Sequence, residues 1–212
     1  MNAFLTCALL SLAAVLSTGC SLLGKPRGGV ASYAPVLSPA TTPAASDRRT
    51  RTWQIEVAEP QTPSSLFGTH ILVSPEPGRV EVYRDARWQD PPALLLQALL
   101  IQGLGESGVA GAAGSASLQH ADFLLESDLL RLQAEYRGEI VPTAAIGVYV
   151  RLVRVADGRV IAARRFSVDE AATASPVPCV VEAFGRAIDH LVRDMAAWAV
   201  AAGDQAWEPP PG

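Results

Sequence analysis

The chain has 212 residues, of which 49% are hydrophobic and 18% are charged, and its formal net charge is −4 at pH 7. This balance is typical of a globular protein with a buried core, and it excludes a chain that is disordered throughout. Because lysine and arginine are not in excess, the composition gives no support to binding of nucleic acid or of an anionic membrane surface.

The first feature along the chain is a short apolar run that ends in the stretch Leu16–Cys20, with the sequence LSTGC. About a dozen apolar residues followed by small ones are typical of a secretory signal peptide and too few for a transmembrane helix. The cysteine directly after the small residues resembles the lipobox of bacterial lipoproteins. There the cysteine takes a diacylglyceryl group, and the new amino terminus takes a fatty acid such as palmitate. We expect a signal peptide over residues 1–19 and lipidation at Cys20.

Two features of this leader depart from the lipobox pattern. Ser17 occupies the position at which leucine is preferred, and Met1 and Asn2 place no lysine or arginine ahead of the apolar run. An ordinary signal peptide with an incidental cysteine is the alternative. In lipoproteins, a residue after the cysteine that is not acidic, here Ser21, implies sorting to the outer membrane.

The cysteine pattern leaves no intramolecular disulfide for the mature chain. Cys7 lies in the signal peptide, Cys20 is the expected lipidation site, and Cys179 is the third and last cysteine. Stability must therefore come from the core. Cys179 fits a buried small apolar residue better than a reactive thiol.

Residues 20–52 are expected to form the lipidated, flexible tether. They are rich in Ser, Thr, Ala, Pro and Gly and cannot bury enough apolar surface to offset the entropy of ordering. A coil of about 32 residues has a root-mean-square reach of roughly 30 Å, which would hold the domain close to its membrane. Tyr33 and Leu37 are the side chains in this segment that we expect to dock on the domain.

The folded domain, predicted over residues 53–202, begins with strands. Residues 53–57 alternate apolar and polar side chains, the period-two pattern of a half-buried strand, and further strands are expected at 70–73 and 79–83. A helix is expected over residues 93–104, with Asp90 as its N-cap and Pro91 at the first helical position.

This helix is apolar nearly all round, with only Gln97 and Gln102 polar between residues 93 and 104. A surface helix shows a single apolar stripe, so the pattern predicts burial on more than one side. One side can lie on the sheet. The other requires a second layer or a neighbouring subunit.

The second half of the domain is predicted as three strands and a helix. A long strand over residues 121–136 is followed by a hairpin, 145–155 and 159–168, whose Asp-Gly turn is a strong hairpin signal. The last helix, residues 180–200, carries one apolar stripe made of Phe184, Ile188, Leu191, Met195 and Trp198. Residues 203–212 are expected to be a disordered tail.

The hairpin is basic, with four arginines: Arg151, Arg154, Arg164 and Arg165. The first interpretation is a solvated strand face. The alternative is a docking patch for an acidic partner, which requires the four side chains to converge in space.

The sequence shows no pattern that predicts catalysis or metal binding. The three histidines, His70, His120 and His190, lie in different predicted elements without metal-ligand spacing. Gly103, Gly105 and Gly108 match G-x-G-x-x-G, but they end a helix instead of joining a strand to one. No G-x-S-x-G elbow surrounds the serines that we considered, Ser74, Ser107 and Ser127. We predict a protein that is not an enzyme, with no catalytic, cofactor-binding or metal-ligating residue.

Several short stretches together resemble the ABC-type transport auxiliary lipoprotein family, the PqiC-like proteins, over about residues 33–198. They are Ile71–Val73, Val80–Tyr83, Ala86–Trp88 ahead of Asp90-Pro91, Leu94–Leu99, Ala121–Glu126, Val150–Val153, Gly158–Ile161 and Arg165-Phe166, and the helix that ends near Trp198. The resemblance implies an α/β fold, a mixed β-sheet packed with helices, similar to the N-terminal domain of TolB.

The resemblance also implies a function: a non-enzymatic outer-membrane lipoprotein that faces the periplasm. Its expected partner is a protein with MCE (mammalian cell entry) domains that serves an ABC phospholipid transporter, and a ring-like homo-oligomer is expected. Only Cys20 takes a defined role from the family, and no cofactor is implied. The alternatives are a carrier that holds an acyl chain in an apolar pocket, which the helix over residues 94–104 would line, and a hydrolase of lipid or cell wall.

Overall fold

The structure, a computed structural model, describes residues 29–38, 51–109, 112–114 and 121–208. The chain divides into two compact units, residues 1–30 and 31–212, and the second is the folded domain described below. Cys20 and His120 lie outside the described residues.

Three long strands form one side of an eight-stranded sheet, with β8 at its edge: β6 (Phe123–Glu135), β7 (Thr143–Arg154) and β8 (Arg159–Ala171). β7 pairs antiparallel with both β6 and β8. The predicted turn joins β7 to β8, and its Gly158 has a φ of 67°, in the left-handed region that glycine adopts without strain. The long strand and the hairpin are thus confirmed.

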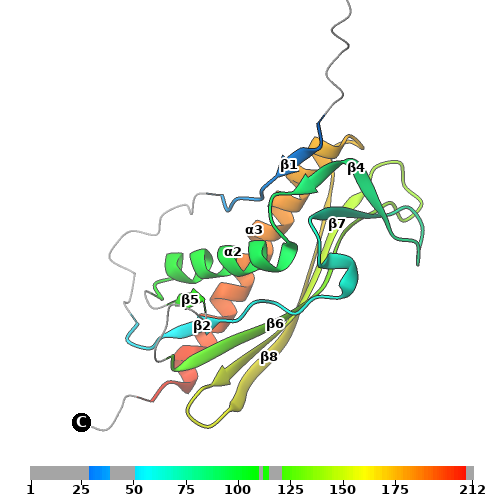
Figure 1. The fold of residues 1–212 in the computed structure, drawn as a ribbon. Helices are drawn as coiled ribbons and strands as arrows, with labels where there is room; N and C mark the ends of the chain where they lie inside the picture. Colours follow the sequence, from blue (N-terminus) through cyan, green and yellow to red (C-terminus); the bar gives the residue numbers. More distant parts are fainter. Residues whose placement is uncertain (1–28, 39–50, 110–111, 115–120, 209–212) are drawn as a thin grey trace, which may run out of the picture. The chain divides into compact units, whose positions relative to one another are not determined.

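Two short branches share the other edge of β6 (Figure 1). β2 (Ile55–Val57) runs parallel to the first part of β6, and β5 (Ala112–Gly114) pairs with β2. β3 (His70–Ser74) runs parallel to the last part of β6 and pairs antiparallel with β4 (Glu81–Trp88). β1 (Ala31–Tyr33) runs parallel to β4. The sheet is therefore mixed and open, and the predicted fold class is confirmed.

Two helices, α2 (Pro92–Glu106) and α3 (Val177–Ala206), cover one face of this sheet (Figure 1). α3 packs on β7 and β8, while α2 packs on α3, β2 and β5. A 3-10 turn, η2 (Ser64–Leu66), lies in the connection from β2 to β3. Within the described residues, no helix covers the other face of the three long strands.

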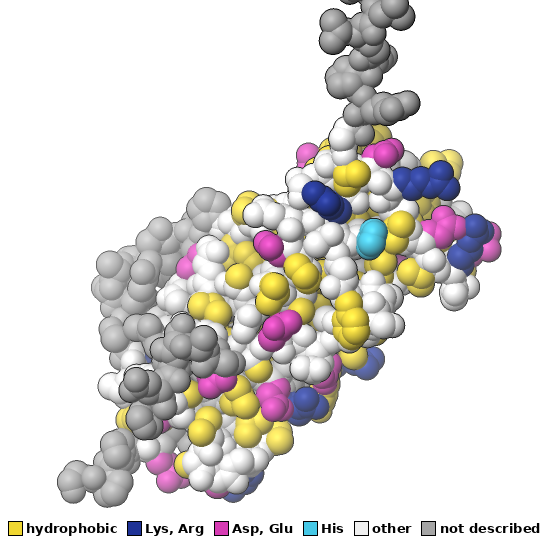
Figure 2. Space-filling view, viewed as in Figure 1, with side chains coloured by type: hydrophobic (Ala, Val, Ile, Leu, Met, Phe, Trp, Pro, Cys, Tyr) yellow, Lys and Arg dark blue, Asp and Glu magenta, His cyan; other side chains and the backbone are white. Residues whose placement is uncertain are grey.

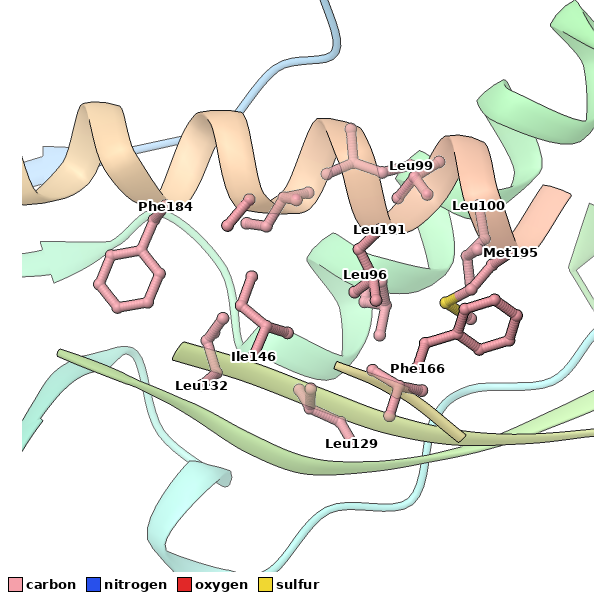
Figure 3. Close-up of a cluster of buried hydrophobic side chains, with 14 of the residues drawn as sticks. Leu96, Leu99, Leu100, Leu129, Leu132, Ile146, Phe166, Phe184, Leu191 and Met195 are labelled. Carbon is pink, nitrogen blue, oxygen red and sulfur yellow. The ribbon is translucent and has the colours of Figure 1, made fainter. Parts of the chain in front are cut away.

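The core lies between the helices and the three long strands (Figure 3). Leu132 and Ile146 from the sheet face Leu96 of α2 and Leu191 of α3, and all four are buried. Edge-to-face aromatic pairs extend the core, with ring centroids separated by 5.4 Å for Trp53–Phe123, 5.3 Å for Trp88–Phe184 and 5.8 Å for Phe166–Trp198. Such pairs add about 0.5–1.5 kcal/mol each beyond the area they bury.

The start of α2 differs from the prediction by one residue. The N-cap is Pro91, which forms no side-chain cap hydrogen bond, and Pro92 is the first helical residue. A proline disfavours helical geometry in the residue before it, so Pro92 holds Pro91 extended, with ψ of 140°. Asp90 is therefore outside the cap position that we expected it to fill.

The segment predicted as a tether is partly folded. Ala31–Tyr33 form β1, and Leu37 is buried, so the expected docking of Tyr33 and Leu37 is confirmed. The Ser38 amide donates to the Asp189 carboxylate at 3.2 Å. A three-residue strand is too short to show period-two alternation, which is why composition alone placed these residues in the tether.

At the other end of the chain, α3 continues to Ala206, into the range predicted as a disordered tail. Gly203 and Asp204 lie in this last turn, where Gly203 packs under the Trp53 ring and Asp204 bonds to Arg51. These contacts join positions about 150 residues apart in sequence, so no local pattern predicts them.

Candidate interaction surfaces

The described histidines, cysteine and serines are spread over β3, β6, the end of α2 and α3. His190 Nδ1 lies 2.9 Å from a Glu170 carboxylate oxygen on the neighbouring strand, and His70 is exposed. Across the described ranges, no three His, Cys, Asp or Glu side chains group closely enough to hold a metal ion. Cys179 is a partly exposed free thiol in the first turn of α3, so the prediction that it is buried is wrong. The Ser107 hydroxyl donates to a backbone carbonyl of its own helix turn at 2.8 Å.

The glycines at the end of α2 have a packing explanation. A Cβ atom on Gly103 would lie 2.6 Å from Val192 Cγ1 of α3, so a hydrogen atom at this position lets the two helices approach closely. Gly108 has a φ of 88° in the turn that follows. The helix crossing explains Gly103 and the turn explains Gly108, whereas an added Cβ on Gly105 would meet nothing within 4 Å.

The four arginines of the hairpin do not converge. Arg151 and Arg165 lie on the open face of the sheet, and Arg151 pairs there with Glu126 at 3.2 Å. Arg164 lies on the helix-covered face, with its guanidinium 4.8 Å from the Phe166 ring centroid, and Arg154 donates to the backbone carbonyl of Ala206 there. Alternate strand positions point to opposite faces, so these residues do not form the single basic patch that the alternative required.

On the open face of the sheet, arginines and carboxylates form ion pairs in which their opposite charges neutralise each other. Arg137 bonds to Glu135 and to Asp169, each at 2.7 Å, and Arg131 reaches both carboxylates at 3.2 Å. Burial raises the pKa of Glu135, but hydrogen bonds from Gln133 and Arg137 and the charges of both arginines outweigh it, so its pKa is below the usual value. This face does not present a net charge to a partner.

The described cavity between the helices and the sheet is too small for an acyl chain. The cavity between α2, α3 and the sheet has a volume of about 20 Å³, and its lining includes Trp88, Leu96, Leu129, Ile146 and Leu191. About 20 Å³ accommodates one water molecule, whereas ligand pockets measure about 300–1,000 Å³. Within the described part of the chain, the interior therefore gives no support to the carrier alternative.

An apolar surface lies beside the start of α2. Phe67 is 67% exposed and Leu94 is 42% exposed, and both line a hollow of about 310 Å³ together with Pro60, Leu66 and Pro91 and with the polar residues Glu59, Gln61 and Thr62. Hydrophobic side chains gather on this face over α2 and η2 in Figure 2. We call these residues the Phe67–Leu94 surface. In the sequence, the only sign of this surface is Phe67, a lone aromatic residue in a connection rich in Pro and Ser.

The prediction that α2 is buried on more than one side is confirmed for part of the helix. Leu100 and Leu104 are fully buried in the core, so the second layer is made by α3 and β5 of the same chain. Leu94 faces outward nonetheless. A single exposed leucine is ordinary, but a leucine beside an exposed phenylalanine at a hollow is typical of an interaction site.

A third feature joins the start of the domain to its last helical turn. Arg51 Nε and Nη2 donate to the Asp204 carboxylate at 2.9 Å each, and the Trp53 indole donates to the same group at 3.0 Å. Arg51 Nη1 also donates to the backbone carbonyl of Ser107, at the end of α2. The junction thus ties three separate segments together.

We expect Asp204→Ala to lower the free energy of unfolding by about 1–3 kcal/mol. It removes the charge-assisted hydrogen bonds from Arg51 and leaves the buried Trp53 indole without its acceptor. Asp194→Ala, at an exposed position of the same helix, is the matched control and should change stability by less than about 0.5 kcal/mol. Urea unfolding measures both, and equal effects would contradict the assigned role of the junction.

Comparison with known proteins supports the fold and the family. Protein XCC0632 from Xanthomonas campestris, a crystal structure assigned to the family model DUF330, is 28% identical, with a TM-score of 0.75 over 82% of this chain and 97% of that one. An uncharacterized protein with a crystal structure is 14% identical, with a TM-score of 0.63 over 80% and 98% of the two chains, a likeness of fold alone. No curated protein sequence matches the chain significantly.

The family model for the ABC-type transport auxiliary lipoprotein component matches residues 36–196. This range takes in α2, the three long strands and most of α3, and its start coincides with the segment that docks on α3. The resemblance drawn from the sequence is therefore confirmed, and the chain belongs to the family of ABC-type transport auxiliary lipoproteins.

Proposed function

We propose that this protein is a lipid-anchored docking component of an ABC transport system that moves phospholipid between the inner and outer membranes. Cys20 carries the lipid, the outer membrane holds it, and the domain faces the periplasm. Its partner is the MCE-domain protein of that system. The observation that carries this proposal is a family match over residues 36–196 placed shortly after a lipobox-like stretch.

The packing of the domain favours docking over carrying or catalysis. A cavity of about 20 Å³ holds no acyl chain, and the open sheet face is occupied by mutually paired charges. A rigid, filled domain is suited to present a surface, because little conformational freedom is lost when it binds. The Phe67–Leu94 surface offers exposed apolar side chains for a contact between proteins.

We further propose that the Phe67–Leu94 surface contacts a second copy of the chain in a ring-like homo-oligomer. Each subunit would offer Phe67 and Leu94 to a different surface of its neighbour, the head-to-tail arrangement that closes rings. Aromatic residues are enriched in such contacts. Docking of the MCE-domain protein would then use the assembled ring.

The test uses residues 29–212, which lack signal and lipid, and measures native mass and binding to the periplasmic part of the MCE-domain protein. We expect a discrete oligomer that binds this partner and carries no lipid. The double variant Phe67→Ser/Leu94→Ser should be monomeric with an unchanged melting temperature. Val155→Ser, at a position that is 50% exposed on the hairpin turn, is the control and should leave the oligomer intact.

Two outcomes would contradict the proposal in different ways. A wild-type monomer that co-purifies with one phospholipid would favour the carrier. An oligomer that the double variant does not disrupt would keep the docking role but reject this surface as the subunit contact.

A further inference from the structure

The chain enters the folded domain beside the first turns of α3. Tyr33 of β1 pairs with Trp88 of β4, and the Trp88 ring stacks edge-to-face on Phe184, seven positions after the start of α3 at Val177. β1 therefore lies level with the beginning of this helix. In Figure 1 it is drawn beside the orange start of α3, and the red end of the helix lies at the opposite end of the domain.

The following residues contact α3 in the order of its sequence. Ser38 bonds to Asp189 and Arg193 in the middle of the helix, and Arg51 bonds to Asp204 in its last turn. The described contacts before and after residues 39–50 thus lie progressively further along α3. The direction of entry is fixed by contacts on the domain itself.

Two turns of the sheet lie at the end where the chain enters. β3 runs parallel to β6 with Ser74 opposite Glu135, so both strands leave the sheet at the same end. The turns that follow them, residues 75–80 and 136–142, line a common hollow of about 340 Å³. The Ser175 hydroxyl, two residues before α3, donates to the backbone carbonyl of Ile140 at 2.8 Å. We call these two turns the entry end.

The entry end presents exposed aliphatic side chains. Ile140 is 86% exposed, the largest exposed fraction among the large hydrophobic residues of the described chain, and Val80 is 52% exposed. Both arginines of these turns are paired, Arg79 with Glu81 and Arg137 with Glu135 and Asp169, and Glu76 and Glu139 are the other charged residues there. Figure 2 shows hydrophobic side chains interspersed with both charge signs at this end. Contact with a lipid surface would therefore depend on the aliphatic side chains.

The length of chain before β1 limits how the domain can stand on its anchor. Ala31 follows Cys20 by 11 positions, and a chain extends at most about 3.6 Å per residue, or about 40 Å in total. α3 has 30 residues and is about 45 Å long. Bringing the far end of α3 to the membrane with the entry end pointing away would require the linker to be almost fully extended. The longer tether predicted from the sequence, over residues 20–52, would let either end of the domain reach the membrane.

We propose that the entry end rests on the lipid surface to which Cys20 is anchored, with Ile140 and Val80 in the headgroup region. α3 then points away from the membrane, and the β7–β8 turn with Val155 faces the periplasm. This orientation rests on the proposed lipid anchor. It assigns the partner-facing surfaces to the end of α3 and the hairpin.

The experiment compares a fluorophore at the two ends of the lipidated mature protein. In a Cys179→Ser background, an environment-sensitive dye is attached at Ile140→Cys or, as the matched control, at Val155→Cys in the other exposed turn. The protein is reconstituted in vesicles of phosphatidylethanolamine and phosphatidylglycerol that contain a lipid quencher near the headgroups. We expect quenching at position 140 to be at least about threefold stronger than at 155. Equal quenching, no quenching at either position, or stronger quenching at 155 would overturn the proposal.

A second anchor without acyl chains tests the orientation of the domain independently of lipidation. Replacing Cys20 with a hexahistidine tag on nickel-chelating lipids keeps the linker length and removes the acyl chains. If the authentic chain is not lipidated but the tagged form is quenched selectively at 140, the orientation holds and the proposed anchor fails. If the authentic chain is lipidated and neither form shows a preference for 140, the anchor holds and the orientation is wrong.

Discussion

The variant Cys20→Ala is expected to lose the membrane association of the protein entirely while its domain folds normally. Each buried methylene of an acyl chain contributes about 0.8 kcal/mol, so two or three chains hold a protein essentially permanently and their loss removes the anchor. None of the helices in the described ranges combines the length and apolar character needed to span a bilayer. Membrane fractionation followed by carbonate washing measures the effect.

The control for this experiment must exclude an uncut signal peptide, whose apolar run can itself hold a protein to a membrane. Placing the Cys20→Ala chain behind a secretory signal that is removed without lipidation provides it, and the mass of the amino-terminal peptide reports both cleavage and acylation. We expect acyl mass on wild-type Cys20 and none on the variant. A cleaved, unacylated variant that still sediments with membranes would show that the anchor lies elsewhere.

The sequence predicted the elements whose patterns are local. The strand over residues 121–136 appears as β6, and the Asp-Gly turn joins β7 to β8 as expected. Period-two alternation spans enough residues in these strands to be distinguished from chance. β1 has three residues and is ordered by pairing with β4, which follows it by about 50 residues, so no local pattern marks it.

The candidate surfaces were predictable to different degrees. Arg164 and Arg165 are adjacent in a strand, so strand geometry alone was enough to place them on opposite faces and to exclude a single basic patch. Phe67 and Leu94 meet across 27 positions of sequence, because the connection after β2 folds back beside the start of α2. Such a contact depends on the sheet order, which a single sequence does not specify.

The short strand β1 shortens the tether and so limits which part of the domain can reach the membrane. With about 32 free residues, any surface of the domain could reach the membrane. The docking of β1 and Ser38 leaves 11 positions from Cys20 to the first residue of β1 and favours one end of the domain. The sequence contained the relevant residues, Tyr33 and Leu37, but not the partners that order them.

A large effect on stability is expected at the crossing of α2 and α3. A Cβ atom on Gly103 would lie 2.6 Å from Val192 Cγ1, closer than nonbonded carbon atoms approach. Val192 is fully buried in a helix, where a β-branched side chain has one strongly preferred rotamer, so it cannot rotate away cheaply. Overpacking of this kind costs about 1–3 kcal/mol, and we expect Gly103→Ala to be destabilised by that amount despite the better helix propensity of alanine.

Gly105→Ala is the matched control, because nothing lies within 4 Å of the added Cβ in the same helix. It should raise the free energy of unfolding by about 0.5–1 kcal/mol, so the two alanines are expected to act in opposite directions. Val192→Ala removes the clashing methyl group, and a double-mutant cycle should show about 1–2 kcal/mol of favourable coupling with Gly103→Ala. Two alanine variants of the same sign, or a cycle without coupling, would mean that the helices cross less closely than this packing requires.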